Sequence, residues 1–200
     1  MNNRLRLFAL AFVTLFLFAI SSPPPACAQH MKLDKSQSKI QFVCAKTDVN
    51  VAHTGTFANM AGTFNPQTGQ LAITLDMQSL STDDAKLTGH LMSPDFFDVR
   101  KFPTASFVST QIRKEQRSGT THVLVGNLTM HGVTQQLAIP CNIFWQGKTL
   151  TTSGQVTLKR SAFGITYGAG QINDDVSLTF HVVCAPDVQM QTVGSGSSNR

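Results

Sequence analysis

Apolar residues recur at every second position through most of this chain, and this alternation constrains the fold more than any other feature of the sequence. The pattern is typical of β-strands that bury one face, because successive side chains point to opposite sides of a sheet. In the segment 174–184, for example, Val176, Leu178 and Phe180 alternate with polar residues. The pattern predicts strands at 38–46, 70–78, 122–130, 134–145, 149–160 and 174–184, with two less regular strands at 53–64 and 104–112.

Short turn sequences join most of these segments, at 65–69, 117–120, 131–134 and 146–149. Consecutive strands linked by short turns are antiparallel neighbours. Pro140 lies inside a predicted strand and indicates a bulge or an unpaired stretch, because proline has no amide hydrogen. The sequence therefore predicts an all-β protein, either an antiparallel barrel or a sandwich.

One long connection, 79–103, interrupts this series of strands. It opens with Thr82 as a predicted N-cap, continues as a short helix to about Leu91, and is ended by Pro94. A connection of this length in a compact barrel is usually a lid or a functional loop. Its aromatic residues, Phe96 and Phe97, either complete the core or rim the mouth of an apolar cavity.

The two ends of the chain differ from the strands. Arg4 and Arg6, the apolar run over 7–20 and a small-residue A-x-A end predict a signal peptide that is cleaved after Ala28. Lipid attachment through Cys27 and an uncleaved membrane anchor are the alternatives. The predicted organisation is a signal peptide over 1–28, a barrel domain over 29–185 and a disordered tail over 186–200.

Charge and motif content exclude several classes of function. The formal charge is +5, and the basic residues are scattered rather than clustered, so nucleic acid is not expected as a partner. None of the six histidines or four cysteines belongs to a metal-binding spacing such as H-E-x-x-H. The sequence also has no G-x-S-x-G motif. We therefore expect no catalytic site, no metal and no cofactor.

Three stretches carry a resemblance to a known family. They are "TGHLMSPDFFDVRKFPTASFVST" at 88–110, "VGNLTMHGVTQQL" at 125–137 and "LKRSAFGI" at 158–165. In order and spacing they resemble the YceI-like family. The resemblance implies a lipocalin-like, eight-stranded antiparallel barrel with one short helix in a long loop, in a periplasmic or secreted protein. It also implies a polyisoprenoid ligand, a long prenyl chain with a quinone or pyrophosphate head.

The match departs from the family pattern at one position. Ala162 stands where the family usually has an acidic residue before Phe163 and Gly164. If that carboxylate contacts a ligand head or a hairpin amide in relatives, the contact is absent here and the ligand differs.

An eight-stranded barrel is wide enough either to be filled by side chains or to hold one slender ligand. Small inward residues, Cys44, Gly126 and Gly154, are expected to leave volume free. The apolar residues expected along such a ligand are Phe42, Phe57, Leu75, Phe96, Phe97, Phe107, Leu128, Ile143, Leu158, Phe163 and Phe180.

Three cationic or ionisable residues are candidates for the head group: Lys46, His90 and Arg160. Arg160 shares the inward parity of its strand, and a buried arginine needs an anionic partner. Asp174 or Asp175 is the first choice for that partner, and a pyrophosphate head is the second. For His131, which precedes Gly132 in a predicted tight turn, a structural role is favoured over ligand contact.

The interpretation that fits these features is an exported protein that binds a polyisoprenoid or another long apolar lipid, with formation of a homodimer left open. The alternatives are a secreted hydrolase or isomerase with a site around His90 and Arg160, and a filled-core adaptor that binds a protein.

The cysteines add a test of the strand order. Cys44 and Cys184 are expected near opposite ends of the seam between the first and last strands, and Cys141 on a strand that neighbours neither. The separations exceed the Cα distance of roughly 7 Å that a disulfide spans. We therefore expect three reduced, buried thiols.

Overall fold

The structure is a computed structural model that describes residues 30–47, 52–117 and 119–187. The predicted signal peptide, residues 1–28, lies outside these ranges, and of the predicted tail residues 186 and 187 alone fall inside them. No helix within the described ranges is both long and apolar enough to cross a membrane.

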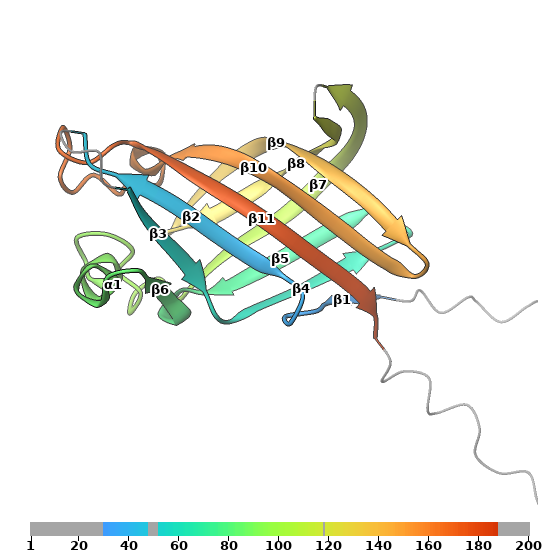
Figure 1. Cartoon of the computed structure of the whole chain (residues 1–200), viewed down its shortest axis with the longest axis horizontal. Helices are drawn as coiled ribbons and strands as arrows, with labels where there is room; N and C mark the ends of the chain where they lie inside the picture. Colours follow the sequence, from blue (N-terminus) through green and yellow to red (C-terminus); the bar gives the residue numbers. More distant parts are fainter. Residues whose placement is uncertain (1–29, 48–51, 118, 188–200) are drawn as a thin grey trace, which may run out of the picture.

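Antiparallel strands form nearly all of the described chain, in one sheet of 11 strands (Figure 1). The strands are β1 (Met31–Leu33), β2 (Lys39–Ala45), β3 (Ala52–Phe57), β4 (Met60–Asn65), β5 (Gln70–Asp76), β6 (Leu80–Thr82), β7 (Thr104–Arg117), β8 (Thr120–Met130), β9 (Val133–Gln146), β10 (Thr149–Lys159) and β11 (Asp175–Pro186). The helices are α1 (Ala85–Met92) and two 3-10 helices, η1 (Met77–Ser79) and η2 (Arg160–Phe163).

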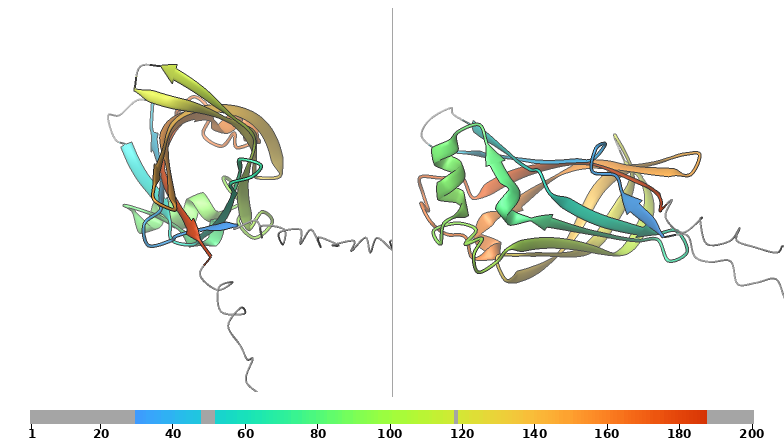
Figure 2. Two further views of the ribbon diagram at one scale, coloured as in Figure 1. Left: turned by 90° about the vertical axis from the view of Figure 1, so that its right-hand side faces the viewer. Right: turned by 90° about the horizontal axis from the view of Figure 1, so that it is seen from below.

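Eight of these strands close into a barrel in the order β1-β4-β5-β7-β8-β9-β10-β11. The closing contact is between β1 and β11, where Leu33 pairs with Cys184. Further along β11, Phe180 pairs with Ile40 of β2. Figure 2 shows the ring from the end at which β1 lies. The prediction of an all-β, eight-stranded antiparallel barrel with one short helix is confirmed.

The predicted strand at 53–64 is divided into β3 and β4 by Ala58 and Asn59. Two further strands were not predicted: β1, which a turn separates from β2, and β6, which η1 separates from β5. The carboxylate of Asp76 caps η1 by accepting from the amide of Gln78. β3 and β6 pair with each other and extend the sheet beyond the ring on the side of α1.

β9 and β10 separate halfway along their length. Their pairing extends from Gln146 against Thr149 to Cys141 against Gly154. The next residue of β9, Pro140, pairs with Val123 of β8 only. The unpaired stretch predicted at Pro140 is therefore confirmed on the β10 side, because proline has no amide hydrogen to donate.

The long connection after β6 carries α1, and its N-cap differs from the prediction. Asp84, not Thr82, caps the helix, and its carboxylate accepts from the amides of Lys86 and Leu87 at 2.7 and 3.2 Å. Thr82 lies in β6, and its hydroxyl bonds the hydroxyl of Thr88 at 2.8 Å. α1 lies beside one end of the barrel (Figure 2). We call this end the mouth and the opposite end, where β1 lies, the base.

Apolar side chains fill the base of the barrel. Met31, Leu33, Phe64, Leu71, Leu150 and Cys184 are all buried there. Trp145 has the same parity in β9 as the buried Cys141 but is 53% exposed. It stands near the turn between β9 and β10, and only the edge of its ring packs against Phe64, with centroids 5.9 Å apart. The base is therefore closed by packing.

Candidate functional site

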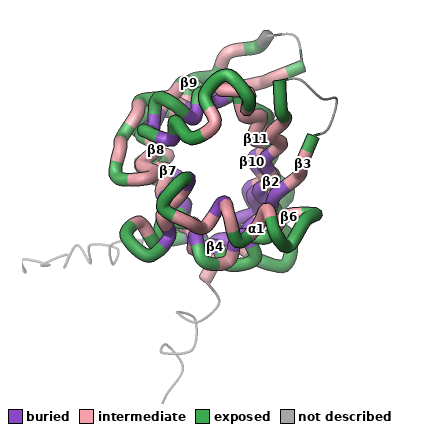
Figure 3. The backbone as a smooth tube through the Cα atoms, turned by 90° about the vertical axis from the view of Figure 1, so that its left-hand side faces the viewer, coloured by how far each residue is buried: buried purple, intermediate pink, exposed green. Residues whose placement is uncertain are grey.

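A cavity of about 720 Å³ occupies the barrel interior at the mouth, where residues of α1 form part of its lining. A second, smaller cavity of about 80 Å³ lies deeper. The two cavities are adjacent, because they share five lining residues: Leu75, Ala105, Leu128, Leu158 and Leu178. Figure 3 shows the backbone of the ring of strands from the mouth. A volume of this size is within the range of small-molecule and cofactor sites.

Polar side chains gather at the mouth, whereas the deeper part is apolar. The polar lining residues of the larger cavity are Lys46, His53, Asp84, Lys86, His90, Arg160 and Gln171. Ser106 is the one polar residue among those that line the smaller cavity. Such a cavity suits an amphiphile that keeps its polar end near the mouth.

Most residues predicted to contact a ligand do line this space. Phe42, Phe57, Leu75, Phe96, Phe97, Leu128 and Leu158 line the larger cavity, and Phe107 and Phe180 line the smaller one. Ile143 and Phe163 line neither. Ile143 lies between the cavity and the base, and Phe163 is 1% exposed within η2, where strand parity does not apply.

The inward glycines do not leave free volume in the way that was expected. A Cβ atom on Gly126 would lie 2.5 Å from Cζ of Phe107, and one on Gly154 would lie 2.8 Å from Cζ of Phe180. The space over each glycine is therefore taken by a neighbouring phenyl ring, which can lie against the barrel wall.

Arg160 lies at the mouth, but its partners are not those predicted. Its guanidinium donates to four backbone carbonyls, those of Ile165, Tyr167, Ile172 and Asn173, at 2.6–3.2 Å. The pairing of Arg160 with a neighbouring carboxylate was therefore wrong. The guanidinium instead holds together the loop that follows η2, and it keeps its positive charge beside the cavity.

The two aspartates considered for Arg160 have other partners. Lys159 contacts Asp175 at 2.9 Å and Asp174 at 3.9 Å. Asp174 also accepts from the amide and the hydroxyl of Ser161 at 2.9 and 2.8 Å. These hydrogen bonds from Ser161 lower the pKa of Asp174, with smaller contributions from the nearby lysine and arginine.

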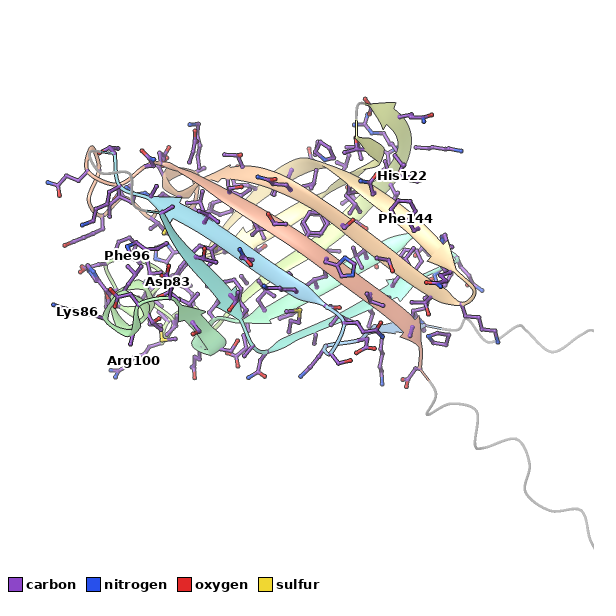
Figure 4. All side chains as sticks on the ribbon, viewed as in Figure 1. Asp83, Lys86, Phe96, Arg100, His122 and Phe144 are labelled. Atoms are coloured by element: carbon purple, nitrogen blue, oxygen red, sulfur yellow. The ribbon has the colours of Figure 1, made fainter. Side chains whose placement is uncertain are left out.

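His90 joins the two segments that cover the mouth. It projects from α1, and its Nε2 lies 3.0 Å from a carboxylate oxygen of Asp95. Its ring contacts those of Phe96 and Tyr167 edge-on, with centroids 4.9 and 5.0 Å apart. Phe96 and Tyr167 also contact each other at 5.2 Å. We call these three rings the mouth cluster; Figure 4 shows Phe96 on the α1 side of the barrel.

A second histidine contacts the segment that joins β6 to α1. Nδ1 of His53, in β3, lies 3.1 Å from the carboxylate of Asp83, and the amide of Thr54 donates to the same carboxylate at 3.4 Å. The hydrogen bond from His53 lowers the pKa of Asp83. Lys46, the remaining head-group candidate, is exposed at the end of β2, where it forms a bridge with Ile172.

His131 lies outside both cavity linings and has structural contacts. It occupies the β8–β9 turn with a φ of 52°, and Gly132 follows with a φ of 74°. Nδ1 of His131 lies 2.9 Å from the carbonyl of Phe163, so the side chain ties this turn to η2. The neighbouring Ala162 is exposed, and its carbonyl accepts from the side chain of Gln135 at 3.0 Å. The position that departs from the family pattern therefore faces solvent rather than the cavity.

The three cysteines within the described ranges, Cys44, Cys141 and Cys184, lie on three separate strands and are free thiols. Cys141 and Cys184 are 0% and 1% exposed, and burial raises the pKa of each thiol to about 11. The expectation that all three are buried was wrong for Cys44, which is half-buried and lines the cavity. Burial is the main cause that raises the pKa of the Cys44 thiol, and the negative charge of Asp83 is the second.

Several lining residues were missed by sequence reasoning. Met130 and Val176 share the inward parity of β8 and β11, so the alternation could have identified them. Tyr167 and Ile172 lie in a glycine-rich loop without periodicity, and no sequence signal placed them.

The described residues include no group of three or more His, Cys, Asp or Glu side chains that could hold a metal ion. Of the histidines at the mouth, His53 pairs with Asp83 and His90 with Asp95. Each contact joins a histidine to a carboxylate. Neither is the pair of a nucleophile and an adjacent base that a hydrolase with a covalent mechanism needs.

Comparisons with known proteins agree with this architecture. The profile of the YceI-like domain family matches residues 31–184. Protein YceI of Salmonella arizonae is 32% identical over 139 residues, which are 64% of this chain and 71% of that protein.

Solved structures show the same fold. BcnA of Burkholderia cenocepacia superposes with a TM-score of 0.66 at 28% identity, over 76% of this chain and 98% of BcnA. A polyisoprenoid binding domain from Saccharophagus degradans also gives a TM-score of 0.66, at 16% identity, over 80% of this chain and 100% of that domain.

Proposed function

The chain belongs to the YceI-like domain family, and we propose that it is an exported protein that encloses a polyisoprenoid or a related long lipid in its barrel. The observation that carries this proposal is the cavity of about 720 Å³, which is apolar in depth and polar at the mouth. The structural neighbour from Saccharophagus degradans, described as polyisoprenoid-binding, supports the same ligand class.

Burial of the apolar chain supplies most of the affinity in this proposal. Removal of apolar surface from water contributes about 25 cal/mol per Å², before the cost of association. The deep lining offers a prenyl chain phenylalanine and leucine side chains, which contain no hydrogen-bonding groups to leave unsatisfied. Binding of this kind needs no reactive residue.

The head group lies at the mouth in this arrangement. Lys46, Lys86 and Arg160 bring positive charge to the lining there, against the single carboxylate of Asp84. A pyrophosphate or a polarised quinone oxygen suits that charge balance. Since four carbonyls already occupy the Arg160 guanidinium, the exposed Lys46 is the better placed group for direct contact.

Organic extraction and mass spectrometry of the protein purified from its own host test the proposal. We expect a prenyl lipid at close to one molecule per protein chain. A protein that carries no lipid after gentle purification, and takes up none when incubated with polyprenols, would contradict it.

Export is a separate part of the proposal and has its own test. The basic, apolar and A-x-A segments before Ala28 support cleavage that leaves Gln29 as the first residue. N-terminal sequencing of the protein from the extracytoplasmic fraction should find this residue. A chain that begins at Met1, or a lipid on Cys27, would contradict the cleavage.

A further inference from the structure

Phe42 and Gly55 form an unusual pair on the inner wall of the barrel near the mouth. They face each other across β2 and β3 in the strand register. A Cβ atom on Gly55 would lie 2.1 Å from Cζ of Phe42 and 2.3 Å from Cε1. The phenyl ring therefore covers the backbone of Gly55, in the space that any other residue would use for its side chain.

The Phe42 ring lies among other side chains that line the cavity. The rings of Phe57 and Phe97 stand 5.9 and 6.4 Å from it, centroid to centroid. On the other side of β2, Phe42 pairs with Leu178 of β11, which also lines the cavity. A side chain at residue 55 would thus push the ring away from the wall and into the cavity.

From this geometry we propose that Gly55 determines the width of ligand chain that the cavity accepts. Without a side chain at residue 55, the Phe42 ring lies against the wall, and the passage stays wide enough for a chain with methyl branches. This inference rests on the proposed function, because it names a feature of the ligand that the same cavity binds.

Gly55 differs from Gly126 and Gly154, the two other inward glycines that phenyl rings cover. A Cβ on Gly126 would also meet the carbonyl oxygen of Val108 at 2.6 Å, and one on Gly154 would meet that of Pro140 at 2.7 Å. Substitution at those positions strains the backbone as well. At Gly55 the close atoms are all in the Phe42 ring. A substitution there therefore changes the width of the cavity beside Phe42 with the least disturbance of the sheet.

The width of the cavity beside Phe42 distinguishes between branched and straight lipid chains. A prenyl chain carries a methyl branch on every five-carbon unit, whereas a saturated straight chain has none. A ring tipped into the passage excludes the wider chain first. Overpacking of this kind typically costs about 1–3 kcal/mol, which corresponds to roughly a 5- to 150-fold change in dissociation constant.

The test compares two alcohols with the same head, geranylgeraniol and hexadecanol, by displacement of N-phenyl-1-naphthylamine. For Gly55→Ala we expect the dissociation constant of geranylgeraniol to rise at least tenfold and that of hexadecanol to change less than threefold. Phe42→Leu, with a smaller side chain over Gly55, should shift the preference in the opposite direction, and it keeps the inference testable if Gly55→Ala folds poorly.

Gly89→Ala is the matched control, because a Cβ at this α1 residue meets nothing within 4 Å. It should leave both dissociation constants unchanged. Equal effects of Gly55→Ala on both alcohols, or no effect on either, would overturn the inference while the proposed function stands. If the unsubstituted protein binds neither alcohol, both the proposed function and the inference fail.

Discussion

At the scale of single residues, the β8–β9 turn shows how one glycine meets two requirements at once. Gly132 has a φ of 74°, a conformation that costs an L-residue about 1–2 kcal/mol. A Cβ there would also lie 2.7 Å from the Phe102 ring, which itself contacts the His131 ring edge-on with centroids 4.7 Å apart. The aromatic residue at the end of the long connection thus packs against the turn, outside the cavity.

Gly132→Val should therefore destabilise the protein without changing what it binds. Backbone strain and overlap with Phe102 together predict a loss of roughly 2–4 kcal/mol, which lowers the Tm by about 5–15 °C. Thermal denaturation and the amount of co-purified lipid check this. Gly69→Val is the control, because Gly69 has a φ of 69° but no atom near its Cβ position, and it should cost about half as much. A loss of lipid that exceeds the loss of stability would contradict the structural role.

Buried thiols give a second prediction at this scale. Folding raises the pKa of Cys141 and Cys184 from 9.0 to about 11, so in alkaline solution the unfolded chain loses these protons first. Their contribution to the unfolding free energy is complete below about pH 8.5 and is lost as the pH rises towards 11, by roughly 2–3 kcal/mol per thiol. Urea denaturation across this range should show a smaller decline for the Cys141→Ala/Cys184→Ala variant. An identical decline would mean that other groups cause it.

At the scale of elements, the mouth is covered by two segments that meet through aromatic rings. One is α1 with the loop that follows it, and the other is the loop after η2, which Arg160 holds through four carbonyls. The mouth cluster of His90, Phe96 and Tyr167 is the contact between them. Because Tyr167 is 46% exposed, this contact can open without unfolding the barrel.

Tyr167→Ala should make the mouth open more often. It removes two ring contacts, each of about 0.5–1.5 kcal/mol, and so raises the open population by roughly 5- to 150-fold. We expect faster release of a bound dye and faster amide hydrogen exchange in α1, with little change in Tm. Phe144→Ala is the control: Phe144 is 57% exposed and lies far from the mouth (Figure 4). Unchanged release and exchange in Tyr167→Ala would show that the cluster does not close the mouth.

At the scale of the whole molecule, strand parity predicted an all-β antiparallel fold and most of the cavity lining, because alternation directly encodes which face a residue occupies. The choice of a barrel over a sandwich came from the resemblance to the YceI-like family. It failed where the backbone is not a strand. Phe163 turns within η2, and Tyr167 and Ile172 lie in a loop whose shape depends on the buried Arg160. β1 and β6 were missed because a strand of three residues shows no period. The orientation of phenyl rings over glycines depends on cross-strand neighbours, which the sequence order alone does not identify.

The distinction between an open and a filled barrel is a property of the whole molecule, and one substitution tests it. Leu128 lines both cavities from a position near the C-terminal end of β8, so a larger side chain there has empty space to occupy. Leu128→Trp should keep or raise the Tm, because the indole ring gains apolar burial, while the lipid content falls to well below half. Leu150→Trp is the matched control. Leu150 is 2% exposed in the filled base, and overpacking there should cost about 1–3 kcal/mol. If Leu128→Trp were as destabilising as Leu150→Trp, the middle of the barrel would be a packed core, and enclosure of a lipid would be wrong.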